Sequence, residues 1–279
     1  MIKNILFILF VFTSISIATS QNKAIKAEIL GKGSPILFLP GFTTPGSIWK
    51  ETIAHLDVKK EAHLISYAGF NGIKPIEIPW YATIKNEIIS YIKENNLKEV
   101  EIIGHSMGGT LAIDIAAALP KKVKSIILVD ALPCMRDVMM PGVPAESIQY
   151  ESPYNKRMLG MNDEQFKGMA SMMSVNMTDQ KEKVDTVTKW ILEADRKTYV
   201  YGYTDLLKLD LRAELSKVTA KTLILGAPTY GTIAKEAMEK QYINLAKKTI
   251  AMAPGGKHFI MFDQAEWFYK QVNDFLTSE

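Results

Sequence analysis

The chain has 279 residues, of which 47% are hydrophobic and 23% are charged, and its formal net charge is +3. This composition is typical of a globular protein and excludes a disordered or collagen-like chain. The small net charge gives no electrostatic argument for nucleic acid as a partner, and the length suffices for one large core or for one core with an inserted lobe.

The N-terminal residues differ in composition from the rest of the chain. Lys3 supplies a positive charge, an apolar stretch runs from Ile5 to about Ala18, and small residues follow at Ala18-Thr19-Ser20. This order is typical of a secretory signal peptide. A membrane anchor is the alternative, but the strictly apolar residues 5–12 are too few to cross a hydrocarbon layer of ~30 Å. We therefore predict a signal peptide over residues 1–20, a secreted or periplasmic location and no stable membrane insertion after cleavage.

The first elements of the mature chain are short strands and one helix. Apolar runs at Ala27–Leu30 and Ile36–Leu39 flank the turn residues Gly31-Lys32-Gly33-Ser34, which predicts a hairpin. Helical spacing follows over Ile48–Leu56, and the next strand is predicted over His63–Ala68.

The middle of the chain alternates between helix and strand. Isoleucines recur every four residues from Ile84 to Ile92, which predicts an amphipathic helix. A β-branched strand at Val100–Ile103, an alanine-rich helix over Thr110–Leu119 and a strand at Ser125–Val129 come next. This alternation predicts a mostly parallel sheet with helices on both faces.

The pattern changes after Asp130. Residues 132–211 contain helical segments and no convincing strand, and they are rich in methionine, with nine of the fourteen between Met135 and Met177. Methionines are common on surfaces that accept varied apolar partners, but they are also ordinary helix formers that pack helix against helix. The single Cys134 cannot form an internal disulfide and is predicted to be a packing residue.

Buried strands resume after the methionine-rich segment. Strands are predicted at Thr222–Leu225 and Thr249–Met252, and a helix over Glu266–Leu276 closes the chain. The predicted organisation is therefore a core in two parts with an inserted helical cap between them, over residues 21–133, 134–211 and 212–279.

The motif with the clearest chemical meaning is Gly104-His105-Ser106-Met107-Gly108-Gly109, which lies between a predicted strand and a predicted helix. A Gly-x-Ser-x-Gly sequence in this setting is typical of a nucleophile elbow, in which a strained turn exposes the serine hydroxyl. The residues two before and two after the serine must be small, because strand and helix crowd them. Ser106 is therefore the predicted nucleophile.

A serine hydroxyl needs a base within reach, and the chain offers four histidines. His258 alone follows the last predicted strand, in the loop Pro254-Gly255-Gly256-Lys257-His258, so we predict that it is the base. His55 and His63 lie upstream and are predicted to be surface or strand residues. His105 is predicted to have a packing or hydrogen-bonding role beside the elbow.

Taken together, these segments resemble the α/β-hydrolase superfamily, in its capped, esterase-like branch. The resemblance covers essentially all of the mature chain and rests on the following segments: Leu39-Pro40-Gly41-Phe42 with Trp49 downstream, Gly104–Gly109, Val129-Asp130 and Gly256-Lys257-His258-Phe259. It implies a serine hydrolase that forms an acyl-enzyme. No cofactor or metal is predicted, because the sequence has no histidine-rich metal spacing and no Gly-x-Gly-x-x-Gly after a strand. The resemblance also implies an oxyanion hole formed by the backbone N–H groups of Phe42 and Met107. Pro40 stands where many members carry histidine, but the donor is a backbone group of a later residue.

The position of the acid departs from most of the family. Most relatives carry it just after the strand that corresponds to Thr222–Leu225, but residues 226–232 contain no carboxylate. Some members place it one strand earlier, where this chain has Asp130. The carboxyl ends of parallel strands share one edge of a sheet, so Asp130 would lie with the serine and the histidine. The alternative carboxylates are Asp263, Asp210 and Asp205.

The predicted function is hydrolysis of a small, largely apolar carboxylic ester. Thioester, lactone, amide and carbon–carbon bond cleavage are alternatives, since the fold does not fix the substrate. A hydrolase fold that only binds a small molecule is an alternative of a different class, against which the presence of Ser106 and His258 argues. The oligomeric state stays open.

Overall fold

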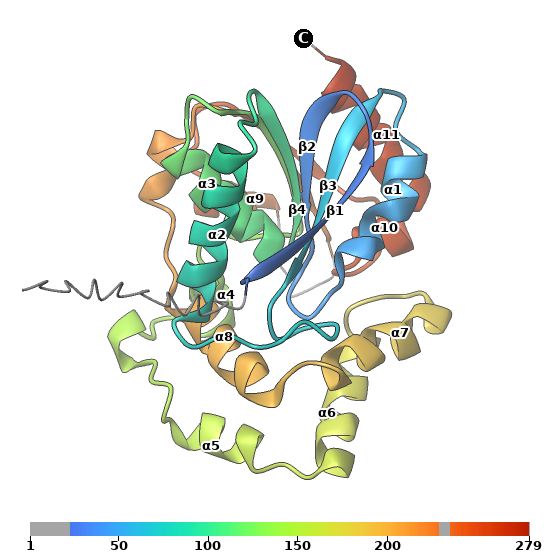
Figure 1. Ribbon diagram of the computed structural model, residues 1–279. Helices are drawn as coiled ribbons and strands as arrows, with labels where there is room; N and C mark the ends of the chain where they lie inside the picture. Colours follow the sequence, from blue (N-terminus) through green and yellow to red (C-terminus); the bar gives the residue numbers. More distant parts are fainter. Residues whose placement is uncertain (1–22, 229–234, 279) are drawn as a thin grey trace, which may run out of the picture.

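The computed structural model describes residues 23–228 and 235–278, so the predicted signal peptide lies outside the described residues. In this part of the chain seven strands form one sheet in the order β1-β3-β2-β4-β5-β6-β7 (Figure 1). Only the pairing of β1 with β3 is antiparallel, which confirms the predicted mostly parallel sheet. The strands are β1 (Ile25–Gly31), β2 (Ser34–Leu39), β3 (Lys60–Tyr67), β4 (Val100–His105), β5 (Val123–Val129), β6 (Lys221–Gly226) and β7 (Lys248–Met252).

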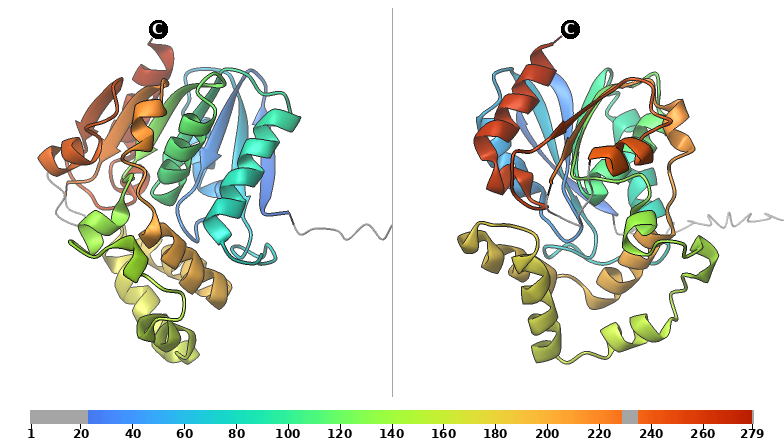
Figure 2. Two further views of the ribbon diagram at one scale, coloured as in Figure 1. Left: turned by 90° about the vertical axis from the view of Figure 1, so that its left-hand side faces the viewer. Right: turned by 180° about the vertical axis from the view of Figure 1, so that it is seen from behind.

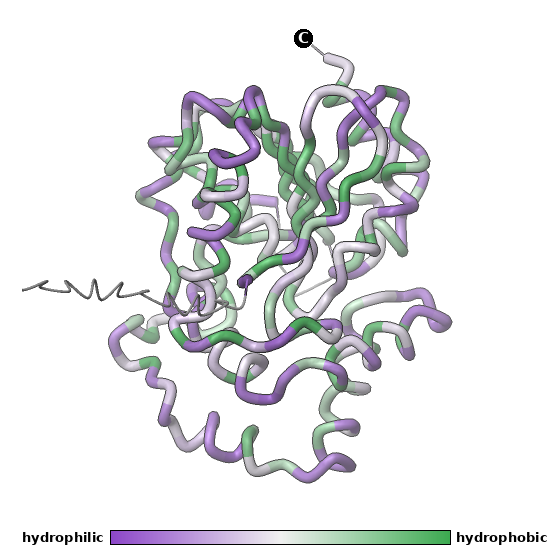
Figure 3. The backbone as a smooth tube through the Cα atoms, in the orientation of Figure 1, coloured by the Kyte–Doolittle hydropathy of each residue, from purple (hydrophilic) through white to green (hydrophobic). Residues whose placement is uncertain are grey.

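Helices cover both faces of the sheet, as predicted (Figures 1 and 2). One face is covered by α1 (Lys50–Ala54) and α11 (Ala265–Thr277), and the other by α2 (Trp80–Glu94), α3 (Met107–Ala118) and α9 (Lys235–Gln241). The periodic isoleucines of α2, from Ile84 to Ile92, are fully buried. The central strands carry runs of hydrophobic residues (Figure 3). Shorter elements of the core are η1 (Gly46–Trp49), η3 (Glu214–Lys217) and α10 (Ile260–Asp263).

The predicted hairpin between the first two strands is wrong. β3 lies between β1 and β2 and pairs with both of them. The connection instead crosses over the start of β3, where a Cβ on Gly31 would lie 2.6 Å from the Lys60 carbonyl oxygen. A Cβ on Gly33 would lie 2.4 Å from the Lys59 carbonyl oxygen. The two glycines therefore allow two backbone segments to cross closely. The sequence around them is also that of a tight turn, so it does not distinguish the two arrangements.

The segment between β5 and β6 is helical throughout its described elements. Before η3 it comprises α4 (Met135–Met139), η2 (Ala145–Ser147), α5 (Pro153–Leu159), α6 (Asp163–Val175), α7 (Lys181–Leu192) and α8 (Arg196–Lys208). These helices lie together at one end of the sheet (Figures 1 and 2). The Leu211 N–H donates to the Pro133 carbonyl over 2.9 Å, so the two ends of this inserted segment meet. In the ranges 23–228 and 235–278, no helix has both the length and the apolar character to cross a bilayer.

Backbone hydrogen bonds extend the sheet beyond its strands at the edge that faces the insertion. The Ser106 N–H donates to the Val129 carbonyl over 2.9 Å, and the Asp130 N–H donates to the Leu225 carbonyl over 2.8 Å. The backbone of Ser106 and Asp130 therefore continues the hydrogen-bonding register of the sheet, which fixes the positions of their Cα and Cβ atoms.

Candidate active site

Ser106 occupies a strained turn between β4 and α3. Its φ is 53° and its ψ is −122°, a conformation that costs of the order of 1–3 kcal/mol for a residue with a side chain. A Cβ on Gly104 would lie 2.3 Å from the Gly108 carbonyl oxygen, and a Cβ on Gly108 would lie 2.1 Å from the Leu39 carbonyl oxygen. Both flanking positions therefore require glycine, as the motif predicts.

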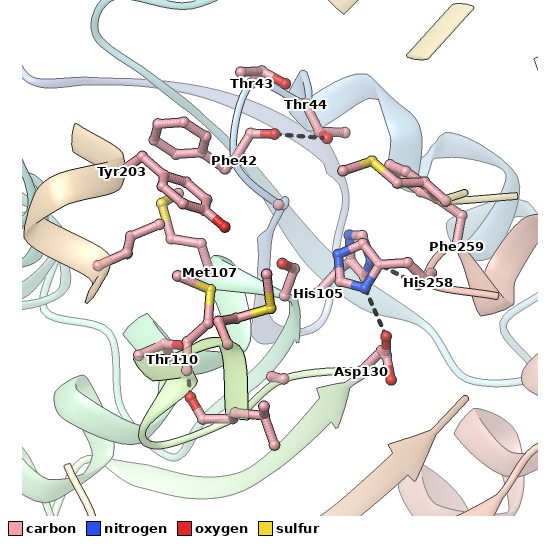
Figure 4. A pocket seen from close by; sticks show the side chains of 18 of the residues that line it. Phe42, Thr43, Thr44, His105, Met107, Thr110, Asp130, Tyr203, His258 and Phe259 are labelled. Carbon is pink, nitrogen blue, oxygen red and sulfur yellow. Dashed lines mark hydrogen bonds and ion pairs between the residues drawn. The ribbon is translucent and has the colours of Figure 1, made fainter. Parts of the chain in front are cut away.

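His258 and Asp130 meet beside this turn (Figure 4). His258 lies in the loop between β7 and α10, and its Nδ1 is 2.6 Å from Oδ2 of Asp130. Asp130 follows β5 directly with a φ of 45°, and its Oδ1 accepts the Ala227 N–H over 3.0 Å. Both carboxylate oxygens are thus engaged, so the carboxylate is fixed in the orientation that holds the imidazole.

His105 supports the loop that carries His258. The His105 side chain is 1% exposed, and its Nε2–H donates to the backbone carbonyl of His258 over 3.0 Å (Figure 4). Burial, and secondarily the neighbouring His258, hold the pKa of His105 well below its usual value. His105 is therefore a neutral donor, in agreement with the predicted hydrogen-bonding role.

The three alternative carboxylates are engaged in other contacts. Asp263 accepts hydrogen bonds from the Thr178 hydroxyl and from the Asp179 and Lys257 N–H groups. Asp210 pairs with Arg212, which holds the pKa of Asp210 below its usual value. Asp205 accepts from the Tyr81 N–H and the Tyr150 hydroxyl. Each of these carboxylates has a structural partner that accounts for it.

The remaining predicted residues also have defined surroundings. His55 ends α1 and stacks on Tyr269 at a ring distance of 4.2 Å. His63 is buried in β3, where its Nδ1 lies 2.7 Å from the Tyr91 hydroxyl. Cys134 is fully buried, which is consistent with its predicted packing role.

Phe42 and Met107, whose backbone N–H groups are the predicted oxyanion donors, line the same pocket. Phe42 follows β2, Met107 begins α3, and both residues line the pocket that contains Ser106 and His258. Among the described residues, no acceptor takes either N–H group. Two unpaired donors beside a serine on a strained turn are what an oxyanion hole requires.

The pocket between the sheet edge and the insertion is strongly apolar. Residues 130–133, α4, α6, α7 and α8 contribute to its walls, and six methionines line it: Met107, Met135, Met139, Met173, Met177 and Met238. Of the described residues that line it, Asp130 is the sole carboxylate, and there is no lysine or arginine. This site accommodates uncharged groups more readily than charged ones.

Sequence reasoning missed several residues of this pocket. Thr43 and Thr44 follow Phe42 and are almost fully buried, and Tyr203 and Leu206 line the pocket from α8. Tyr199, Tyr203 and Leu206 have the i, i+4, i+7 spacing of one helix face, a signal that the sequence carries. That spacing shows a buried face but does not show which surface the face meets.

Comparisons with known proteins identify the family of the chain. The model of the family described as "Alpha/beta hydrolase family" matches residues 36–271. A pimeloyl-[acyl-carrier protein] methyl ester esterase from Shewanella woodyi is 22% identical over 264 residues, which cover 92% of this chain and 99% of the relative.

Two solved structures have the same fold. An esterase from Exiguobacterium antarcticum has a TM-score of 0.77 at 19% identity, with 92% of this chain and 98% of that chain covered. An enol-lactonase from Burkholderia xenovorans LB400 has a TM-score of 0.74 at 15% identity, with 91% and 96% covered. These likenesses confirm the predicted fold, a mostly parallel sheet covered by helices.

Proposed function

The chain belongs to the alpha/beta hydrolase family, and we propose that it is a serine hydrolase that cleaves small, largely apolar carboxylic esters. The observation that carries the proposal is the pocket lined jointly by Ser106, His258 and Asp130, in which the His258 Nδ1 lies 2.6 Å from the Asp130 carboxylate. The curated relative from Shewanella woodyi, which acts on a methyl ester, supports ester hydrolysis as the reaction class.

In the proposed reaction Ser106 Oγ attacks the ester carbonyl carbon while His258 Nε2 takes the hydroxyl proton. The Phe42 and Met107 N–H groups stabilise the oxyanion of the tetrahedral intermediate, and one such donor contributes about 2.7–4 kcal/mol in comparable sites. His258 then gives the proton to the leaving alkoxide as the C–O bond breaks. Water, deprotonated by His258, releases the acid from the acyl-enzyme by the same steps.

Asp130 orients the imidazole and stabilises its protonated form during both steps. The second hydrogen bond to Asp130, from the Ala227 N–H, keeps the carboxylate from rotating away. His105 holds the carbonyl of His258, so the base is fixed at its backbone as well as at its ring.

The walls of the pocket support an apolar, uncharged substrate. Met173, Met177, Val187 and Ile191 come from the insertion, which on this proposal acts as the cap of the site. An unpaired charge would lose its hydration among these side chains without gaining a partner. Thioesters and lactones meet the same requirement and are the alternative substrates.

The proposal is tested first with a fluorophosphonate probe, which labels only an activated serine. We expect labelling of the wild-type protein and none of Ser106→Ala. In a panel of p-nitrophenyl esters, kcat/KM should then be at least about tenfold higher for esters with neutral acyl groups than for esters of equal length with a terminal carboxylate. A folded wild-type protein that resists labelling would favour the binding-protein alternative.

We also propose that the protein acts outside the cytoplasm, on the basis of the signal-peptide pattern of residues 1–20. Expression of the full chain in a bacterial host should deposit it in the periplasm, with an N-terminus near residue 21 by N-terminal sequencing. Retention of residues 1–20 in the exported protein would contradict cleavage.

A further inference from the structure

The turn that carries the proposed oxyanion donor is fixed on its carbonyl side. The Thr44 N–H donates to the Gly41 carbonyl over 3.1 Å. Gly41 C=O and Phe42 N–H belong to one planar trans peptide, in which they point in opposite directions. The hydrogen bond to Gly41 therefore sets the direction of the Phe42 N–H.

The same turn holds its third residue in a left-handed conformation. Thr43 has a φ of 63°, which is rare for a β-branched residue. The Asn71 side-chain amide donates to the Thr43 carbonyl over 3.0 Å and so keeps the turn in this form. The direction of the donor thus depends on a hydrogen bond within the turn and on one from Asn71, which lies outside the segment between β2 and η1.

The ring of Phe42 is enclosed by four aromatic side chains. Phe70 and Trp80 from the core lie at ring distances of 4.9 and 5.7 Å, and Tyr199 and Tyr203 of α8 lie at 5.6 and 5.8 Å. Tyr203 lies directly beside Phe42 in Figure 4. The residue that carries the donor is therefore held between the core and the inserted helix.

Gly202 is the position in α8 where a Cβ atom would meet the Phe42 ring. It lies inside a thirteen-residue helix, a position where glycine is a poor helix former. A Cβ on Gly202 would lie 3.2 Å from Cε2 of Phe42 and 3.2 Å from Cε3 of Trp80. Glycine at this position therefore leaves the space that the Phe42 ring occupies.

Of the two rings beside Gly202, Phe42 is the one that can yield. Trp80 is 1% exposed, and its indole N–H donates to the Ala68 carbonyl over 2.9 Å. Phe42 is partly exposed to the pocket and has no comparable anchor on its ring. An added methyl group at position 202 would thus displace Phe42 by a few tenths of an ångström.

We propose that Gly202 is a positioning residue for the oxyanion hole. With Tyr199 and Tyr203 it forms the surface of α8 on which the Phe42 ring packs, and this packing fixes the position of the Phe42 N–H. This inference rests on the proposed function, because it takes Phe42 as a donor in the reaction. It assigns to the inserted helix a part in stabilising the transition state in addition to enclosing the substrate.

The first experiment compares Gly202→Ala with Gly168→Ala. Gly168 lies inside α6, and nothing would lie within 4 Å of a Cβ there. We expect Gly202→Ala to lower kcat about tenfold while KM stays within about threefold, because both chemical steps pass through an oxyanion. Gly168→Ala should retain the wild-type kcat and KM. Equal kcat values in the two variants would overturn the proposal.

A double-mutant cycle separates positioning from general damage to α8. Leucine at position 42 lacks the Cε2 and Cζ atoms that approach Gly202, so in the Phe42→Leu background the Gly202→Ala change should alter kcat by less than about twofold. Strictly additive losses would overturn the proposal, since they would mean that the methyl group acts elsewhere than on Phe42.

Inhibitors give a second readout that a purely structural effect would not produce. A trifluoromethyl ketone adds Ser106 Oγ to its carbonyl carbon and forms a tetrahedral oxyanion, whereas the matching methyl ketone binds largely without addition. Gly202→Ala should weaken the first about tenfold and leave the second unchanged. If the wild-type protein is not labelled by fluorophosphonate, the proposed function fails; if it is labelled and Gly202→Ala weakens neither inhibitor, only this inference fails.

Discussion

The sheet edge and the inserted helices build the same pocket by different means. At the sheet edge, Ser106, Asp130 and Thr43 all have positive φ values, and backbone hydrogen bonds hold the first two in step with neighbouring strands. In the insertion, the pocket is walled by side chains such as Met173 and Ile191 on regular helices. On the proposed function, the reacting groups are therefore held by strained backbone, and the substrate is enclosed by adaptable side chains.

The difference predicts how each region tolerates change. A conservative substitution at the sheet edge alters the position or tautomer of a reacting group, and therefore kcat. A conservative substitution in the insertion alters apolar contacts that are made equally with substrate and transition state, and therefore mainly KM. Gly202 is the proposed exception, since it acts on the sheet edge from within the insertion.

The largest effect is expected for Asp130→Asn. The Ala227 N–H needs an acceptor, so the asparagine carbonyl would turn toward it and the amide NH₂ would face Nδ1 of His258. That arrangement favours the tautomer with the proton on Nε2, which cannot accept the serine proton. We expect kcat to fall by about 10⁴-fold, as for a mispositioned tautomer in a serine protease triad.

Asp263→Asn is the matched control for this prediction. Asp263 lies five residues from His258 in the chain, but its carboxylate joins Thr178 of the insertion to the Lys257 backbone. We expect a loss in kcat of less than about tenfold, because only hydrogen bonds of structural character weaken. If Asp263→Asn proved the more damaging variant, Asp130 would not be the acid.

Much of the core could be predicted because its signals are local. The buried face of α2 follows from isoleucines at helical spacing, and β4, β5 and β6 follow from short β-branched runs. The pairing of Asp130 with His258 followed from the rule that the carboxyl ends of parallel strands share an edge. The structure brings these two residues within hydrogen-bonding distance.

What could not be predicted depends on contacts between distant segments. The loop from Gly31 to Ser34 has the sequence of a hairpin turn, and only the insertion of β3 between its flanking strands excludes one. Likewise, Gly202 and Asn71 carry no local signal, since their meaning comes from the Phe42 ring and the Thr43 carbonyl that they meet. Local sequence patterns predict individual helices and strands, whereas the packing of one element on another depends on contacts throughout the fold.

A smaller effect, mainly on KM, is expected for Met173→Glu in the insertion. Met173 lines the pocket, and its Sδ accepts the Tyr199 hydroxyl over 3.5 Å. A carboxylate there would lose hydration without a cationic partner in the described wall. We expect kcat/KM for neutral esters to fall by about 10–100-fold, most of it in KM.

Met172→Glu is the control, since the neighbouring Met172 is 65% exposed on the same helix. Its kinetic constants should match those of the wild type within about twofold, because a charge there stays hydrated. Met173→Leu keeps the apolar volume and should stay within about threefold. A loss confined to kcat in Met173→Glu would contradict the expectation that substitutions in the insertion act mainly on KM.

The smallest effect on activity is expected for His105→Gln, which changes the pH dependence of stability instead. Burial holds the pKa of His105 well below its usual value, so the native state leaves it neutral while the unfolded chain protonates it below about pH 6.5. Unfolding then takes up a proton, and the free energy of unfolding falls as the pH drops through this region, with a slope that approaches about 1.4 kcal/mol per pH unit. Glutamine does not titrate but still carries an N–H donor for the His258 carbonyl. The variant should therefore lose less stability than the wild type between pH 7 and pH 5 in denaturant titrations, with kcat at pH 7.5 within about threefold of the wild type.

His63→Gln is the matched comparison: the pKa of His63 is also lowered by burial, but His63 lies in β3 and contacts Tyr91 and Glu61. It should flatten the pH dependence without altering kcat, whereas His105→Leu, which removes the donor to the His258 carbonyl, should lower kcat more than His105→Gln does. Equal kcat values for His105→Leu and His105→Gln would show that the hydrogen bond to His258 has no part in holding the base.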